Sequence, residues 1–132
     1  MSEKTLYETY SNVQVSPLPK DMYIVTKSFT LNGVNVREGF TTDGATIPRI
    51  LWVFWPPNRS TYLPAVIVHD FQLKGYTTNK QFKVANIKFK QNLELLDVDG
   101  ITVFLFYLGV ETHRLINYLI IPKIKNFLNI NN

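Results

Sequence analysis

The sequence predicts an α+β fold, in which a small antiparallel sheet with a β-hairpin and a long structured loop precede about three packed helices. Three observations indicate this class. An Asn-Gly pair separates two β-branched runs in the first third of the chain, apolar residues recur at helical spacing in the second half, and 45% of the 132 residues are hydrophobic. We expect a single domain over residues 1–132, with a β-rich part and loop over 1–49 and a helical part over 50–132.

Composition excludes several classes of protein. The absence of cysteine excludes a disulfide scaffold and cysteine-ligated metal sites. The net charge of +4 is small for a nucleic-acid-binding protein, so no nucleic-acid partner is expected. The longest apolar run, Val103 to Val110, is shorter than the ~20 residues that cross a bilayer, and the polar start lacks a signal-peptide pattern. We expect neither a membrane span nor export by that route.

The front of the chain is predicted to form strands. Met22 to Phe29 is rich in β-branched and aromatic residues, and Asn32-Gly33 then supplies the two positive φ angles of a type I′ turn. Ser16 to Pro19 is expected to form a turn or an extended edge, and Asn12 to Val15 a short additional strand. The segment Gly39 to Arg49 carries two glycines, a proline and small polar residues, which predicts a structured loop without a strand or helix.

An aromatic segment follows the loop. It contains Trp52, Trp55 and the pair Pro56-Pro57 within residues 50–57. Scattered aromatic side chains usually pack inward, which favours a core role. The alternative is an exposed surface on which these four residues contact a partner.

Three helices are predicted in the second half. Ser60 or Thr61 is expected to cap a helix over residues 62–73, with Gly75 ending it. A capping box over residues 78–81 starts a second helix that runs to about residue 96. Its apolar stripe and its lysines fall on different faces, so the lysines are expected to be solvated. A third helix is predicted from Asp97 or Asp99 to about residue 120, where Pro122 would interrupt it. The tail from residue 123 is expected to be a short amphipathic turn or a docking segment.

Two polar residues stand in the first of these helices, whose other faces are nearly all apolar. His69 and Asp70 point about 100° apart on it. A buried carboxylate is costly without a partner, and the loop offers Asp43 and Arg49. An Arg49–Asp70 pair would keep the carboxylate charged, and an antiparallel second helix would bring Asn86 near His69 or Asp70. We therefore expect a buried network of these residues. His113, at the polar end of the third helix, is expected to be solvated.

The loop and the helix together resemble a known family. Gly-Phe-Thr-Thr-Asp-Gly-Ala-Thr-Ile-Pro-Arg over residues 39–49 and His69-Asp70 at the end of an apolar helix are similar to the phage and prophage family catalogued as domain of unknown function 1353. The resemblance covers about residues 37–89. It implies a phage or prophage origin and brings no established activity. Where the family has Ala-Asp-x-x-Phe, this chain has Ala85-Asn86-Ile87-Lys88-Phe89, and Leu73 replaces the usual aromatic residue three positions after the Asp.

A weaker similarity is to the phospholipases A2. In those enzymes a His acts as general base on a water, and the adjacent Asp helps to hold calcium with loop carbonyls. The resemblance implies His69 as the base and Asp70 as a calcium ligand with carbonyls around Thr42 to Gly44. If the protein is an enzyme, Asp43 is a further candidate catalytic residue beside His69 and Asp70. Asn86 would be a poor substitute for the orienting carboxylate.

Three functions remain open. The first is a phage-encoded structural or interaction protein, virion- or tail-associated, in which Asp43, Arg49, His69, Asp70 and Asn86 maintain shape and other phage structural proteins are the partners. The second is a His-based or calcium-assisted hydrolase of an ester or amide in the host envelope. No metal or cofactor is expected under the first function. The protein is expected in the virion or in the cytoplasm of the infected host, where a role against host defence is a third alternative. The oligomeric state is not predicted.

Overall fold

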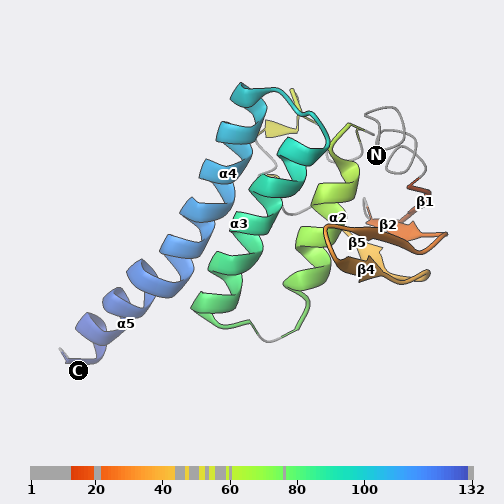
Figure 1. The fold of residues 1–132 in the computed structure, drawn as a ribbon. Helices are drawn as coiled ribbons and strands as arrows, with labels where there is room; N and C mark the ends of the chain where they lie inside the picture. The colour runs from red at the N-terminus through yellow and green to blue at the C-terminus, as the bar shows by residue number, and fades with distance from the viewer. Residues whose placement is uncertain are drawn as a thin grey trace.

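A computed structural model describes residues 13–19, 22–43, 47, 51, 52, 54, 55, 59, 61–75 and 77–130. The strands are β1 (Val15–Leu18), β2 (Met22–Val25), β3 (Phe29–Leu31), β4 (Val34–Val36) and β5 (Thr41–Thr42). The helices are α2 (Leu63–Gln72), α3 (Asn79–Leu95), α4 (Gly100–Leu115) and α5 (Ile121–Ile130), and the π-helical segment η2 (Ile116–Ile120) joins the last two. The predicted α+β class is confirmed, since antiparallel strands precede packed helices (Figure 1).

The strands form two small antiparallel sheets. One has the order β1-β2-β5, and the other is the β3-β4 hairpin. Asn32 and Gly33 have φ angles of 50° and 81°, as the predicted type I′ turn requires. Two details differ from the prediction. The run from Met22 to Phe29 divides into β2 and β3, which belong to different sheets, and Thr41-Thr42 forms the short strand β5 against Tyr23 and Ile24 of β2.

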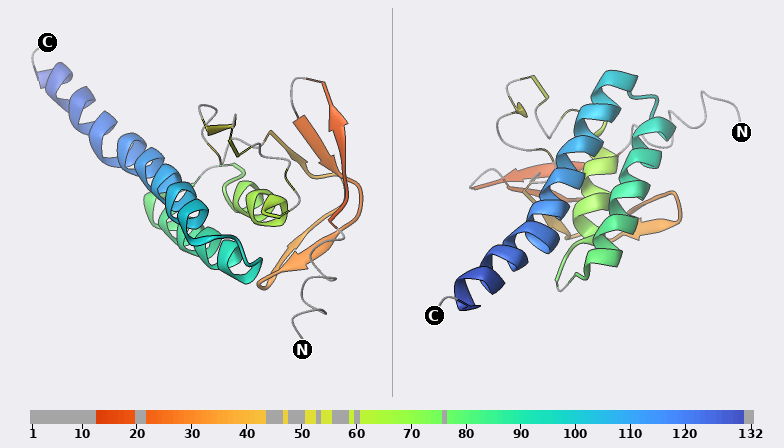
Figure 2. Two further views of the ribbon diagram at one scale, coloured as in Figure 1. Left: turned by 90° about the horizontal axis from the view of Figure 1, so that it is seen from above. Right: turned by 90° about the vertical axis from the view of Figure 1, so that its left-hand side faces the viewer.

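Helix α2 lies between the sheets and the other helices (Figures 1 and 2). On its sheet side, Leu63, Ile67 and Val68 pack with Val25, Leu31 and Val36. On its helical side, Ala65 and Val66 join a second cluster with residues of α3 and α4 such as Phe89 and Phe106. A helix covered on two sides has no wide solvent face. This position explains why α2 is apolar in nearly every direction.

The ends of α2 only partly follow the prediction. Tyr62 is the N-cap residue and no side chain caps the helix, so the expected role of Thr61 is wrong, while Ser60 lies outside the described residues. Instead, the amide of Leu63 bonds to the Arg59 carbonyl at 2.9 Å. Gly75, three residues after the last residue of α2, has a φ of 87° and turns the chain toward α3.

Both later helix starts are confirmed. Thr78 and Gln81 form the predicted capping box at α3, and Asp99 caps α4 through the Thr102 amide at 3.0 Å. Pro122 does not interrupt the third helix as predicted, because helical structure continues through η2 into α5. A proline lacks an N–H and crowds the carbonyl four residues earlier. The widened turn of η2, closed by an Ile121 N–H to Ile116 carbonyl bond, accommodates it.

Candidate functional site

The centre of the molecule holds a polar network that joins three helices. The ring of His69 on α2 lies with Nε2 2.6 Å from Asn86 Oδ1 on α3. The Asn86 amide donates to the Val110 carbonyl at 3.1 Å and to Glu111 Oε1 at 2.9 Å, both on α4. His69 is 2% exposed and Asn86 is fully buried. The network therefore runs across the helix interfaces and not along an open surface.

The network continues on the far side of Glu111. Arg114 binds both oxygens of the Glu111 carboxylate, at 3.2 Å through Nε and at 2.8 Å through Nη2. The remaining guanidinium nitrogen donates to Asn79 Oδ1 at 2.8 Å, at the start of α3. The hydrogen bonds from Arg114, more than any other contact, hold the pKa of Glu111 below its usual range. We call His69, Asn86, Glu111, Arg114 and Asn79 the polar network.

The polar network determines the tautomer of His69. Both hydrogens of the Asn86 amide nitrogen point to acceptors, so its oxygen must face the imidazole. Nε2 of His69 therefore carries the proton and donates it to that oxygen. Burial lowers the pKa of His69 to about 4, against a smaller opposing effect of the Asn86 bond. The imidazole is neutral at physiological pH.

Aromatic rings enclose His69. The Phe89 ring lies 4.8 Å away and the Phe82 ring 6.1 Å away, centroid to centroid. Phe82 in turn stacks on His113, which is exposed as predicted. This packing separates His69 from solvent. A general base must reach the proton that it removes, and the enclosed ring does not offer that access.

Asp70 occupies a different environment from His69. It is half-buried at the end of α2 that faces β5, and not fully buried as the sequence predicted. Burial raises the pKa of Asp70 and nearby Asp43 adds to the rise, while a hydrogen bond from the Thr42 side chain and the Lys74 cation oppose it. The structure therefore places Asp70 and Asp43 near each other and turns His69 away from them, toward α3.

The proposed Arg49 partner of Asp70 lies outside the described residues. Among the described residues, Lys74 is the cation whose charge lowers the pKa of Asp70. The Lys74 ammonium also donates to the Thr41 carbonyl at 3.3 Å and lies 4.9 Å from the centroid of the Phe40 ring. Asp43 is exposed, so the expected buried cluster is wrong for this residue. Asp43 and Lys74 thus lie near Asp70 at the surface, whereas the loop residues Thr42 and Ile47 are buried.

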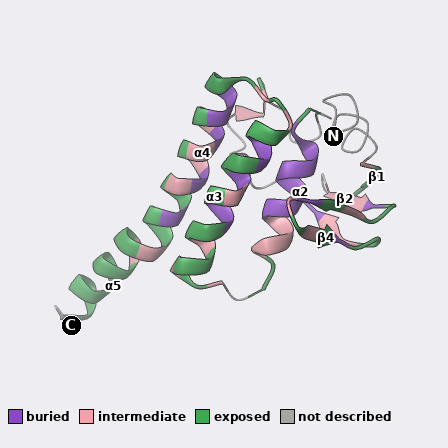
Figure 3. Cartoon of the chain, in the orientation of Figure 1, coloured by how far each residue is buried: buried purple, intermediate pink, exposed green. Residues whose placement is uncertain are grey.

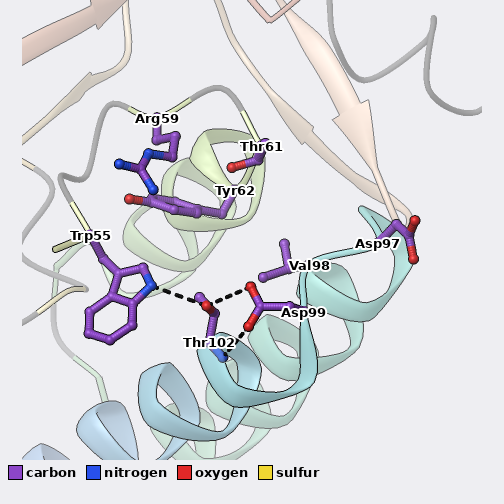
Figure 4. A pocket seen from close by; sticks show the side chains of 8 residues that line it. All are labelled: Trp55, Arg59, Thr61, Tyr62, Asp97, Val98, Asp99 and Thr102. Atoms are coloured by element: carbon purple, nitrogen blue, oxygen red, sulfur yellow. Dashed lines mark hydrogen bonds between the residues drawn. The ribbon is translucent and has the colours of Figure 1, made fainter.

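The two tryptophans point inward. The Trp52 indole donates to the Ile47 carbonyl at 2.8 Å, and the Trp55 indole donates to Thr102 Oγ1 at 3.1 Å. The Thr102 hydroxyl donates in turn to Asp99 at 2.7 Å. Figure 4 shows this relay beside a hollow on the surface. The residues that line the hollow are Trp55, Arg59, Thr61, Tyr62, Asp97, Val98, Asp99 and Thr102. Both indoles pack against the helical core, whereas Pro56 and Pro57 lie outside the described residues.

The described residues contain no group of three or more His, Asp or Glu side chains that could hold a metal ion. A calcium site that uses Asp70 and the carbonyls around Thr42 to Gly44 would include Gly44, which lies outside the described residues. None of the helices in the described part of the chain is both long and apolar enough to cross a membrane.

Comparison with known proteins identifies a family. The model of the family described as "Protein of unknown function (DUF1353)" matches residues 18–110. The chain belongs to this family. The match is longer than the resemblance seen in the sequence motifs, since it extends from β1 into α4. No curated protein matches the chain, and no solved structure matches it either.

The DUF1353 match ends at Val110, one residue before Glu111. The Asn86 contact with His69 therefore lies inside the matched region, whereas Glu111 and Arg114 lie beyond it. Sequence reasoning missed Glu111, Arg114 and Asn79 as members of the polar network. The available signal was the three-residue spacing of Glu111 and Arg114 within an otherwise apolar helix, which places opposite charges on one face.

Proposed function

We propose that this protein is a phage-encoded structural or interaction protein that associates with the virion or its tail. The observation that carries the proposal is the number of large apolar side chains exposed along the last helices. Ten large hydrophobic side chains of α4, η2 and α5 are between 39% and 72% exposed. Contiguous exposed patches of this extent are rare in monomers and mark sites of interaction.

The polar network supports the same proposal. Its members form hydrogen bonds with one another, and each of these bonds joins two helices or two turns of one helix. Fully satisfied buried networks rigidify a fold and specify one arrangement of its core. Such an arrangement holds α4 in a fixed position relative to α2 and α3. The exposed face that begins on α4 is therefore presented on a rigid support.

The hydrolase hypothesis receives less support from this geometry. It needs a His that can activate water beside an Asp that can bind calcium. Here His69 is 2% exposed and its Nε2 proton is held by Asn86, while Asp70 faces Thr42, Asp43 and Lys74. The two side chains that the hypothesis combines lie on different sides of α2. We therefore do not assign the site to catalysis.

The test is the location of the protein during infection. Particles of the encoding phage, purified through a density gradient, should contain the protein at a constant ratio to a known coat protein, as measured by quantitative mass spectrometry. Its absence from purified particles together with its abundance in the soluble fraction of infected cells would overturn the proposal. That result would instead favour a role inside the host, such as action against a host defence.

A second measurement addresses catalysis directly. His69→Ala in the complete chain should lower stability, because it strands the Asn86 oxygen. If the protein instead hydrolysed envelope esters or amides, and this variant lost that activity while keeping its melting temperature, His69 would be catalytic and the proposal would be wrong.

A further inference from the structure

The exposed apolar side chains of the last helices form one surface, which we call the α4–α5 face. Its members are Ile101, Phe104, Leu108, Leu115, Ile116, Leu119, Ile120, Ile124, Phe127 and Leu128. Figure 1 shows α5 projecting beyond the ends of α2 and α3, and Figure 3 shows the exposed residues along this projection. The opposite side of α4 is already used, since Val103, Phe106 and Val110 are buried in the helical core. Helix α4 is thus apolar on two sides, and one of them is unpartnered among the described residues.

Along α4 and η2, four members of this face have the spacing of a helix–helix seam: Ile101, Leu108, Leu115 and Leu119. The half-buried Leu105 and the exposed Thr112 complete the pattern. Positions 101, 105, 108, 112, 115 and 119 alternate in steps of four and three residues, and all except Thr112 are isoleucine or leucine. Steps of four and three are the a/d pattern of helices that pack side by side. The face therefore fits a partner helix better than a flat or irregular surface.

The size of the face suits a stable interface. The exposed fractions of its ten side chains together equal about five fully exposed large side chains. At roughly 200 Å² each, this is on the order of 1,000 Å² per chain. A standard protein interface buries about 800 Å² on each partner. The α4–α5 face alone can therefore supply one.

The charges beside the face indicate the partner and its direction. Asp97 and Asp99 precede α4, and Lys123 and Lys125 lie on α5, while no Asp or Glu occurs after Glu111. Asp99 and Lys123 are each 12 residues from Glu111 (111 − 99 and 123 − 111), and Asp97 and Lys125 are each 14 residues from it (111 − 97 and 125 − 111). Two antiparallel copies centred near Glu111 would bring each basic end beside the acidic end of the other copy. Parallel copies would bring lysine beside lysine.

The centre of such a pair is compatible with two copies. Glu111 would lie near its own counterpart across a two-fold axis, where like charges repel. Arg114 already binds both oxygens of Glu111 in the same chain, which neutralises this charge. Antiparallel packing also places opposite ends of the helix dipoles together.

We propose that the α4–α5 face binds a second copy of this chain and forms an antiparallel homodimer. The inference rests on the proposed function in that it names the partner of the same face. Such an interface is isologous, because each copy contributes the same surface. The dimer would leave the sheets and the Asp70 surface of each copy outside the contact.

The test begins with the purified full-length chain. Sedimentation velocity should show a dimer that dissociates on dilution from about 100 µM, because self-association follows mass action. The double variant Leu108→Glu, Leu115→Glu should weaken association about 100-fold or more, since it places charges at the centre of the interface. Val84→Glu is the matched control, because Val84 is 53% exposed but lies on α3; it should leave the dimer intact. Circular dichroism should show unchanged helicity in both variants.

Cysteine variants test the direction, because the chain has no cysteine of its own. Under mild oxidation, Thr112→Cys near the centre should form a disulfide-linked dimer, whereas Ile101→Cys at the end should not. Efficient cross-linking of Ile101→Cys would mean parallel packing and would overturn the proposal. Asp97→Lys and Lys125→Glu should each weaken the dimer, and the two changes combined should restore it.

A chain that stays monomeric at about 100 µM overturns the proposal. If that monomer co-sediments with phosphatidylglycerol vesicles and not with phosphatidylcholine vesicles, the face belongs to an anionic membrane surface instead. These measurements use purified protein, so they are independent of particle association. A dimer that is absent from phage particles would refute the proposed function alone, and a monomer present in particles would refute this inference alone.

Discussion

Two asparagines on α3 provide a direct test of the polar network. Asn86 and Asn92 are both fully buried on the same helix. Asn86 makes three side-chain hydrogen bonds, to His69, the Val110 carbonyl and Glu111. Neither side-chain polar atom of Asn92 has a hydrogen-bond partner among the described residues. Replacing each by Leu removes the same amide and adds a similar volume.

The expected effects are opposite. In Asn86→Leu, the loss of three hydrogen bonds costs about 1 kcal/mol each, and the buried N–H of His69 is left without an acceptor at about 1–3 kcal/mol more. We expect the free energy of unfolding to fall by about 4–6 kcal/mol. In Asn92→Leu, no hydrogen bond is lost and the burial cost of an unpartnered amide is removed, so stability should rise by about 1 kcal/mol or more.

Urea denaturation at pH 7, monitored by circular dichroism, gives the denaturation midpoint of each variant. The change in midpoint, multiplied by an m-value shared by all variants, gives the change in the free energy of unfolding. The difference between the two variants is the informative quantity, because errors from the added volume are shared. Equal destabilisation by both substitutions would refute the reasoning, since it would show that side-chain shape and not hydrogen bonding decides the effect at these positions.

Three further predictions concern single groups. The pKa of His69 is about 4 in the folded chain and about 6.5 in the unfolded chain, so between these values the unfolded chain binds one more proton. The free energy of unfolding should therefore fall by about 3 kcal/mol as the pH drops from 6.5 to 4. Urea denaturation at several pH values should show this loss, and His69→Gln should remove it. Burial and Asp43 raise the pKa of Asp70, so the charged form of Asp70 is disfavoured in the folded state. Asp70→Asn should therefore raise the melting temperature at pH 7, with a smaller gain at pH 3. A lower melting temperature in this variant would instead indicate that the carboxylate has a cationic partner. Trp55→Phe keeps an aromatic ring but loses the bond to Thr102, so thermal denaturation should show a loss of about 1 kcal/mol.

The hydrogen bonds of Asn86 explain why an amide suits this position in this chain. The motif on which the resemblance to the family rests has Asp at the position of Asn86. An Asp here could accept from His69 but could not donate to Val110 or Glu111. A carboxylate would face the Glu111 carboxylate directly. In this chain the amide is therefore the residue that satisfies both neighbours at once.

Features that depend on neighbouring residues were predictable from the sequence. The Asn32-Gly33 turn, the capping box of Thr78 and Gln81, and the Asp99 cap all arise from contacts within three or four positions. Their chemistry is contained in a short window: positive φ angles for the turn, and side-chain acceptors for exposed helix amides. The helical periodicity of α3 also predicted that Ala85, Phe89 and Leu93 face the core, but it did not predict the full burial of Asn92.

Tertiary packing decided the rest. The sequence placed His69 and Asp70 about 100° apart, but only the position of α2 between sheet and helices sent one to Asn86 and the other toward Thr42. Contacts such as Asn86 with Glu111, 25 positions apart, and Trp55 with Thr102, 47 positions apart, join separate elements. A local pattern shows that a buried polar group needs a partner, because desolvation is costly. Which group becomes that partner depends on how whole helices and strands pack, and that packing is a property of the entire chain.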